Sequence, residues 1–281
     1  MGLAFAAMWS SAFTSARIIV EYAPPLIALA FRFLISGVIG VGIAAWLGQS
    51  MRLSRRQWVG VLVFGLCQNA LYLGLNFVAM QTIEASLAAI IASTMPLLVA
   101  LAGWLIMGQR IRPLGIMGLI AGVVGVTLIM GARLQGGVDM FGLILCVIGV
   151  VSLTIATLVV LGASSGGNVL MIVGLQMLVG SAILWIPALM FETFDITWNW
   201  QLIVAFIYTT LVPGLVATWV WFTLVGRIGA VKASTFHFLN PFLGVAIAAV
   251  LLGERIGMLD VVGVVVIAGG ILAVQLSKQP T

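Results

Sequence analysis

Only 7% of the 281 residues carry a charged side chain, whereas 63% are hydrophobic. Soluble domains hold about 25% charged residues, so this composition excludes an ordinary soluble domain. The net charge of +5 comes from few side chains, without a basic stretch that alternates with aromatic residues, and therefore gives no indication of nucleic-acid binding.

Hydrophobic runs follow one another along nearly the whole chain. A helix needs about 20 apolar residues to cross a bilayer core of roughly 30 Å, so we predict an all-α, polytopic protein embedded in the lipid bilayer. Prolines and glycines separate the runs. The ten predicted membrane helices are 2–20, 24–48, 57–80, 84–107, 113–131, 139–162, 169–191, 201–225, 231–252 and 258–277.

Basic residues favour one end of these spans. If the N-terminus is cytoplasmic, all seven acidic residues fall at outer ends, and most basic residues fall in cytoplasmic breaks, as the positive-inside rule requires. We therefore predict that both termini are cytoplasmic. The basic residues of the cytoplasmic side are Arg52, Arg55, Arg56, Arg110, Arg112, Arg227, Lys232 and Lys278.

The two halves of the chain repeat at an offset of 145 residues, which relates Pro96 to Pro241. Five spans in each half would insert the second half upside down, the arrangement of many secondary transporters with a midplane substrate site. We predict a 5+5 inverted-topology repeat with halves 1–134 and 135–281, against the alternative of a duplicated but inert bundle. The other matched positions are Gly108 and Gly253, Arg110-Ile111 and Arg255-Ile256, Gly118 and Gly263, and Gly125 and Gly270.

Polar side chains gather in the third span. Asn69, Tyr72 and Asn76 share one helix face, and Gln68 is adjacent in sequence. Amides in hydrocarbon are costly unless they are satisfied, so these groups either bond neighbouring helices or line a wet cavity. We favour the cavity, and we expect Tyr72→Ala or Asn69→Ala to reduce activity without unfolding the protein.

Matched prolines interrupt the fourth and ninth spans. A proline inside a helix removes a backbone hydrogen bond and frees a carbonyl, so Pro96 and Pro241 are predicted hinges or kinks. Polar residues precede both of them. The full set of predicted substrate-binding residues is Gln68, Asn69, Tyr72, Asn76, Ser93, Thr94, Met95, His237, Asn240 and Trp9.

Three kinds of residue leave functional and structural interpretations open. His237 could relay a proton, although a satisfied hydrogen-bonding role is the more common one. Arg32 is an intramembrane charge, for which we favour a structural role. Cys67 and Cys146 fall inside apolar spans and are interpreted as small core residues. With a single histidine in the chain, we predict neither a metal site nor a catalytic cluster.

The paired motifs resemble a known family. Pro96…Gly108-Gln109-Arg110-Ile111 and its copy Pro241…Gly253-Glu254-Arg255-Ile256 are similar to the EamA-type transporters of the drug/metabolite transporter superfamily. Gln109 departs from the pattern, which usually has Glu there, as at Glu254. The resemblance covers the full length. Trp9-Ser10-Ser11-Ala12-Phe13 and Arg32-Phe33 also belong to it.

This resemblance implies a cofactor-free carrier of the bacterial inner membrane that works by alternating access. Within the family the chain looks most like exporters of aromatic amino acids, so the expected substrates are aromatic and other neutral amino acids or similar small metabolites. A multidrug or cationic-metabolite efflux carrier is the alternative, disfavoured because no carboxylate lies deep in the membrane to pair with a cation. A facilitative channel and an integral-membrane enzyme are weaker alternatives, and either a monomer or a homodimer is compatible with the sequence.

Overall fold

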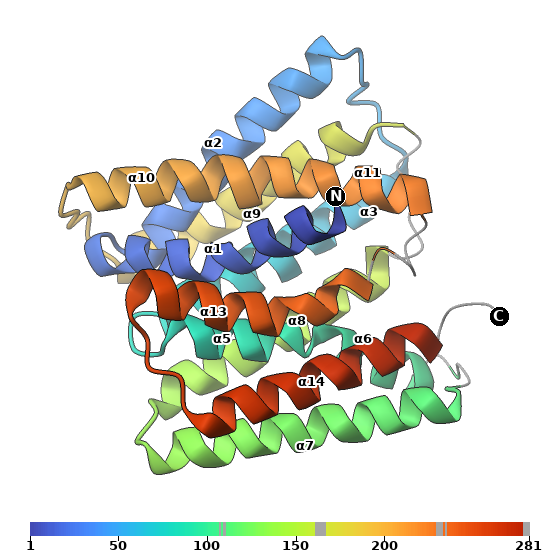
Figure 1. The fold of residues 1–281 in the computed structure, drawn as a ribbon. Helices are drawn as coiled ribbons and strands as arrows, with labels where there is room; N and C mark the ends of the chain where they lie inside the picture. The colour runs from blue at the N-terminus through green and yellow to red at the C-terminus, as the bar shows by residue number, and fades with distance from the viewer. Residues whose placement is uncertain (107, 109–110, 161–166, 229–232, 234, 278–281) are drawn as a thin grey trace. The chain divides into compact units, whose positions relative to one another are not determined.

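A computed structural model describes residues 1–106, 108, 111–160, 167–228, 233 and 235–277 (Figure 1). These residues form helices and connecting turns without a strand. Nine of the described helical stretches are long and apolar enough to span a membrane, and Phe236–Leu252 is a shorter apolar helix. The predicted all-α architecture with ten hydrophobic spans is confirmed. Of the residues discussed above, Gln109, Arg110, Lys232 and Lys278 lie outside the described residues.

Several spans consist of more than one helical segment. The third span is α3, η1 and α4, the fourth is α5 and α6, the eighth is α10, η2 and α11, and the ninth includes η3 and α13. The elements are α1 (Gly2–Tyr22), α2 (Pro25–Trp46), α3 (Arg55–Phe64), η1 (Gly65–Leu73), α4 (Gly74–Ala79), α5 (Ala85–Ser93), α6 (Met95–Leu105), α7 (Pro113–Gln135), α8 (Met140–Val160), α9 (Val169–Phe191), α10 (Trp200–Thr209), η2 (Thr210–Val216), α11 (Ala217–Ile228), η3 (Thr235–Leu239), α13 (Asn240–Leu252) and α14 (Met258–Ser277).

The chain folds into two compact units, and each takes segments from both sequence halves. Unit 1 contains Met1–Thr14, Thr82–Ile144 and Val220–Thr281, and unit 2 contains Ser15–Gln81 and Leu145–Trp219. The compact units therefore differ from the predicted repeats 1–134 and 135–281. A repeat concerns equivalent positions in the sequence, whereas a compact unit concerns which helices pack together, so the repeat boundaries stay a prediction.

In unit 1, α7 and α14 lie side by side (Figure 1). A Cβ atom added at Gly118 would lie 2.6 Å from the carbonyl oxygen of Gly270, and one at Gly125 would lie 2.8 Å from that of Gly263. From Gly118 to Gly125 along α7, the contacted residue on α14 moves back from Gly270 to Gly263, so the two helices are antiparallel. Because only glycine lets the backbones approach this closely, the glycine faces serve to pack one helix on the other.

In unit 2, α2 and α9 pack in a similar antiparallel way. A Cβ at Gly37 would lie 3.0 Å from the carbonyl oxygen of Gly174, and the hydroxyl of Ser181 donates to the carbonyl of Ala30 at 2.8 Å. Ala30 and Gly174, like Gly37 and Ser181, are separated by 144 residues, close to the offset of 145 predicted from the sequence. Unit 2 also contains a small cluster of buried apolar residues, formed by Ala44, Val61, Met171 and Leu175.

Acidic residues at span ends hold the starts of other helices. Glu192 accepts hydrogen bonds from the backbone N–H groups of Leu26 and Ile27 at 2.9 and 2.8 Å. Glu254 accepts from Ala85 and Ser86 at 2.8 and 3.0 Å in the same manner. A carboxylate there satisfies orphan N–H donors and the positive end of the helix dipole, so these acids are structural caps.

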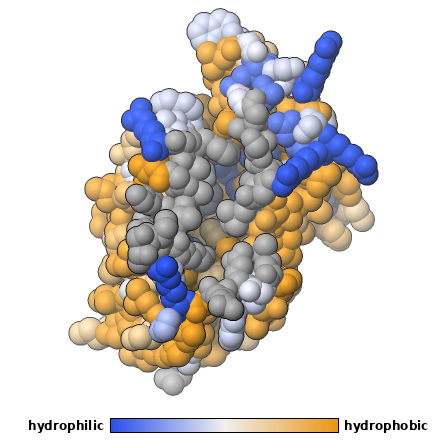
Figure 2. Space-filling view, turned by 90° about the vertical axis from the view of Figure 1, so that its right-hand side faces the viewer, coloured by the Kyte–Doolittle hydropathy of each residue, from blue (hydrophilic) through white to orange (hydrophobic). Residues whose placement is uncertain are grey.

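Hydrophobic side chains form most of the coloured surface in Figure 2, and hydrophilic side chains lie in separate patches. On α7, residues such as Met117, Ile120 and Val123 are at least 60% exposed. A water-facing helix would bury such side chains, whereas lipid accepts them without cost. The exposed apolar faces therefore agree with a multi-pass membrane protein.

Candidate functional site: a polar turn in an aromatic cluster

His237 and Asn240 form a buried polar pair where the ninth span changes from η3 to α13. They stand three residues apart, and Pro241 follows as an early residue of α13. Asn240 Nδ2 lies 2.9 Å from His237 Nδ1. When the amide donates, Nδ1 accepts, and the imidazole proton must lie on Nε2.

The backbone carbonyl of Asn240 has a hydrogen-bond donor, whereas its side-chain oxygen has none within the part of the chain that the structure describes. Ser10 on α1 donates its hydroxyl to the Asn240 carbonyl at 3.3 Å. In contrast, Asn240 Oδ1 is buried and has no hydrogen-bond partner among the described residues, although the side chain is only 7% exposed. A buried acceptor without a donor costs about 1–3 kcal/mol. Such a group is a candidate for binding a ligand donor.

Aromatic rings surround the imidazole of His237. The ring centroids of Phe5 and Trp221 lie 5.4 and 5.1 Å from the imidazole centroid, and Trp9 lies at 6.4 Å with an interplanar angle of 90°. Phe5 and Trp9, one helical turn apart on α1, also contact each other. We call Phe5, Trp9, Trp221, His237 and Asn240 the aromatic–amide cluster. All five residues belong to unit 1.

The aromatic–amide cluster combines three kinds of chemistry. Asn240 Oδ1 can accept from an ammonium or amide group, and the His237 Nε2–H can donate to a carboxylate. The rings offer flat, polarizable surface on which an apolar or aromatic body stacks. A small solute with one donor, one acceptor and an aromatic or apolar body would use all three. Among the described residues, no group of His, Cys, Asp and Glu could hold a metal ion.

A second unpaired hydroxyl lies on α1. Thr14 Oγ1 is buried without a partner among the described residues, and it stands one turn after Ser10 on the same face of the helix. The site residues predicted from the sequence include neither Thr14 nor Phe5. The i, i+4 spacing of Phe5 and Trp9, and of Ser10 and Thr14, is the signal that could have drawn attention to this face.

The predicted residues of the fourth span lie at a helix break in unit 1. Helix α5 ends at Ser93, and α6 begins at Met95 with Pro96 in its first turn. Ser93 donates to the Ala89 carbonyl at 2.6 Å, and Thr94 donates to that of Ile91 at 2.7 Å. Both hydroxyls are thus satisfied within their own helix. Pro96 and Pro241 both stand in the first turn of a new helical segment inside a span, as expected for kinks.

The predicted residues of the third span lie in unit 2, and two of them bond neighbouring backbone or side chains. Asn69 Nδ2 donates to the Gln176 carbonyl at 2.9 Å. Asn76 Nδ2 donates to the Tyr72 carbonyl at 2.7 Å, and its Oδ1 accepts from the thiol of Cys146 at 3.4 Å. Tyr72 is fully buried, whereas Gln68 is partly exposed. These contacts favour the helix-bonding interpretation of Asn69 and Asn76 that the sequence left open.

The other tryptophans of the spans divide among different environments. Trp185 packs edge-to-face on Phe31 with centroids 4.9 Å apart and stacks near Phe194. Trp219 is 58% exposed, so it faces outward from α11.

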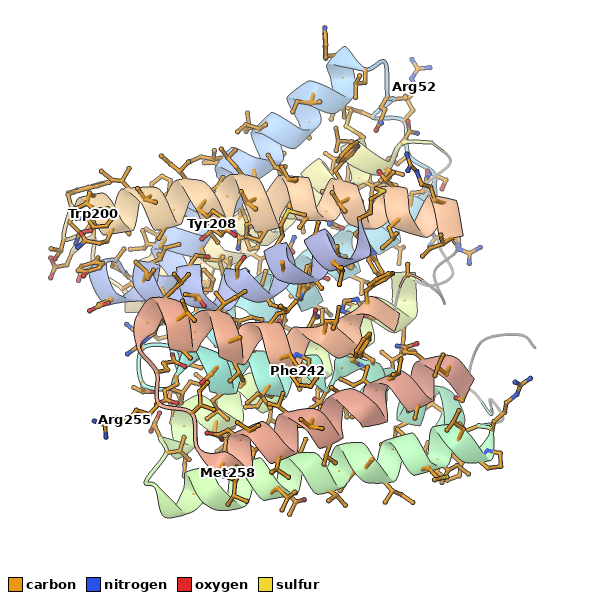
Figure 3. All side chains as sticks on the ribbon, viewed as in Figure 1. Arg52, Trp200, Tyr208, Phe242, Arg255 and Met258 are labelled. Carbon is orange, nitrogen blue, oxygen red and sulfur yellow. The ribbon has the colours of Figure 1, made fainter. Side chains whose placement is uncertain are left out.

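In unit 2, Arg52 and Trp200 lie at opposite ends with Tyr208 between them, and in unit 1 Arg255 and Met258 lie at one end of the unit, away from Phe242 (Figure 3). Charged and interfacial aromatic residues therefore mark span ends, as in other membrane proteins.

The fold and the aromatic–amide cluster define a polytopic helical membrane protein with a buried polar site. The model of the EamA-like transporter family matches residues 1–131 and 140–276, and the chain belongs to this family. It is a multi-pass membrane transporter with a small-molecule substrate, which sets aside the integral-membrane enzyme considered above.

Individual relatives agree with this assignment. The chain is 28% identical over 273 residues to the uncharacterized transporter YvbV of Bacillus subtilis (strain 168), covering 97% of this chain and 89% of that protein. It is 29% identical over 113 residues to the aromatic amino acid exporter YddG of Ancylobacter novellus, covering 40% of this chain and 39% of that one. A crystal structure with 19% sequence identity matches with a TM-score of 0.72 and covers 99% of this chain and 97% of its own, which supports the fold alone.

Proposed function

We propose that this chain is a secondary transporter that exports aromatic and other neutral amino acids across the bacterial inner membrane by alternating access. The observation that carries the substrate class is the aromatic–amide cluster. It has an unpaired acceptor at Asn240 Oδ1, a neighbouring donor at His237 and three aromatic rings. An aromatic amino acid presents an ammonium, a carboxylate and a flat apolar body, so it matches each of these groups.

The packing of repeat-equivalent helices supports the mechanism. Gly118 contacts Gly270, and Gly125 contacts Gly263. The predicted repeat equivalent of Gly118 is Gly263, and that of Gly125 is Gly270, so each glycine contacts the equivalent of the other. Such reciprocal contacts between antiparallel helices are expected of an inverted-topology repeat, whose halves can exchange conformations and open the site to either side in turn. The two family-model matches, at 1–131 and 140–276, also support the two repeats.

The distribution of charge supports the orientation. Arg52, Arg55 and Arg56 are exposed near the start of α3, whereas Glu192 and Glu254 follow α9 and α13, whose ends are predicted from the sequence to lie on the outer side. Cytoplasmic ends collect Arg and Lys, so we infer that both termini are cytoplasmic. The name of the relative YddG further supports amino-acid export, although the matched region is 40% of this chain.

Counterflow in proteoliposomes tests the proposal. Unlabelled phenylalanine inside the vesicles should accelerate uptake of labelled phenylalanine, which a channel would not do. Trp221→Leu removes one ring that contacts His237 and should raise KM about three- to tenfold, the equivalent of roughly 0.5–1.5 kcal/mol of lost aromatic contact. Trp219→Leu, two residues away and outward-facing, is the matched control and should leave KM unchanged.

Two outcomes would contradict the proposal. Wild-type protein that is folded in vesicles but exchanges no aromatic or neutral amino acid would refute the substrate class. Equal effects of Trp221→Leu and Trp219→Leu on KM would remove the aromatic–amide cluster from the site.

A further inference from the structure

Wide, π-type turns interrupt the third and eighth spans at equivalent positions of the two halves. They are η1 (Gly65–Leu73) and η2 (Thr210–Val216), and their first residues are 145 positions apart. Both belong to unit 2. Helix α9 packs on η1, and α2 packs on η2. Wide turns of this type are rare and often occur at functional sites, so the residues that hold them are of interest.

Proline explains the local geometry of η2. Pro213 has no N–H, so it cannot donate to the carbonyl of Thr209 four residues earlier, as a residue of a regular α-helix would. Two donors from α2 reach this part of the turn instead. Arg32 Nε donates to the Thr209 carbonyl at 3.2 Å, and Ser36 Oγ donates to the Thr210 carbonyl at 3.3 Å. Two adjacent carbonyls at the helix break therefore accept hydrogen bonds from side chains of the neighbouring helix α2.

The surroundings of Arg32 explain why such contacts are needed. The side chain is only 5% exposed, and none of the described residues forms an ion pair with it. Its guanidinium lies 5.1 Å from the ring centroid of Phe33. A buried cation without a carboxylate is costly, and backbone carbonyls at a helix break are among the partners that can lower this cost.

Between η1 and α9, the corresponding hydrogen bond is made without a charged side chain. Asn69 stands 144 positions before Pro213, and Gln176 stands 144 positions after Arg32. There the turn supplies the donor, because Asn69 Nδ2 donates to the Gln176 carbonyl. Side-chain-to-backbone hydrogen bonds thus connect both wide turns to their packing helices, and of the three bonds named here Arg32 makes the one that involves a charged residue.

We propose that Arg32 is a positioning residue. Its Nε–H holds the wide turn η2 in place of the hydrogen bond that Pro213 cannot make, and it thereby sets the rate at which the eighth span changes conformation during transport. The hydrogen-bond donor at the ε position performs this role, and the positive charge is not required. The effect on transport rests on the proposed function above, whereas the effect on the turn does not.

Two isosteric substitutions separate the donor from the charge. Arg32→Gln places an amide N–H donor where Nε stands and removes the charge, and it also makes position 32 identical to its approximate repeat counterpart, Gln176. Arg32→Met places a methyl group at the same position and removes both donor and charge. Pro213→Ala restores a backbone N–H that can pair with the Thr209 carbonyl, so it should make the donor at position 32 dispensable.

Hydrogen–deuterium exchange of residues 209–217 in detergent-solubilised full-length protein measures the turn directly. In Arg32→Met these amides should exchange about tenfold faster than in the wild type, as expected for the loss of one hydrogen bond. In Arg32→Gln they should stay within about twofold of the wild type, and in the double variant Arg32→Met/Pro213→Ala the protection should return. If Arg32→Met alone yields no folded protein, Arg32→Gln and the double variant Arg32→Met/Pro213→Ala carry the test, and in both these amides should stay within about twofold of the wild type.

Counterflow of phenylalanine by the same variants measures the consequence for transport. Arg32→Met should lower the maximal rate per folded molecule about tenfold and leave KM within twofold, a separation that a general loss of stability would not produce. Equal damage in Arg32→Gln and Arg32→Met, or failure of Pro213→Ala to restore Arg32→Met, would overturn the inference. If no variant, wild type included, transports amino acids while the exchange pattern holds, the proposed substrate is wrong and the role of Arg32 in the turn stands.

Discussion

The contact between α7 and α14 makes a quantitative prediction about the scaffold. Gly118→Ala adds a methyl group that would lie 2.6 Å from the Gly270 carbonyl oxygen and 2.9 Å from the Val274 nitrogen. Both are backbone atoms, so no rotamer change can relieve the overlap. The two helices must separate by several tenths of an ångström along their closest contact, and the neighbouring glycine contacts must loosen with them.

The expected loss of unfolding free energy in Gly118→Ala follows from the cost of overpacking a tightly packed interior. Adding a methyl group to such a contact typically costs about 1–3 kcal/mol. Gly131→Ala on the same helix meets no atom within 4 Å, and there alanine should stabilise the helix by up to about 1 kcal/mol. The difference between the two variants should therefore be about 1–4 kcal/mol. On α14, Gly270→Ala and its neighbour Gly269→Ala form a second matched pair, with close contacts only at Gly270.

Denaturant unfolding in mixed micelles, followed by circular dichroism, measures these differences. Gly118→Ala and Gly270→Ala should unfold at lower denaturant concentration than the wild type, and Gly131→Ala and Gly269→Ala at equal or higher concentration. If Gly118→Ala were as stable as Gly131→Ala, the close antiparallel packing of α7 on α14 would be refuted.

Three further predictions concern single polar contacts. Glu192→Ala, which removes a cap from α2, should destabilise the protein by about 1–2 kcal/mol in the same assay, whereas the exposed Glu21→Ala should not. Hydrogen bonds from Thr82 and from a backbone N–H lower the pKa of Asp139, so this carboxylate favours the folded state above its ordinary pKa and loses that effect as the pH falls through the lowered value. Thr82→Val should raise the Asp139 pKa in a carboxyl-resolved infrared titration, and an unchanged pKa would contradict the contact. Asn69→Ala should lower stability by about 1–2 kcal/mol through its lost hydrogen bond, and unchanged stability with abolished transport would return this residue to the substrate site.

Local pattern predicted some site residues well because their roles depend on chain position alone. A proline inside a span must interrupt the helix whatever its neighbours are, and Pro96 and Pro241 do stand in the first turns of new segments. Pro213 carries the same signal in the eighth span, where η2 interrupts the α-helix. The polar residues of the third span show the limit, because helix phase placed them on one face but did not say which groups would meet that face.

The sequence by itself determined the ten membrane helices of this transporter, because the bilayer demands a fixed apolar length of every span and sets its polar residues apart. The internal offset likewise predicts which positions of the two halves are equivalent. Tertiary structure decided which buried polar groups are satisfied. Asn69 and Asn76 have hydrogen-bond partners, Asn240 Oδ1 has none among the described residues, and Arg32 donates to the Thr209 carbonyl, 177 residues away at a helix break. These outcomes depend on which helices pack together, and neighbours distant in the chain leave no trace in local periodicity.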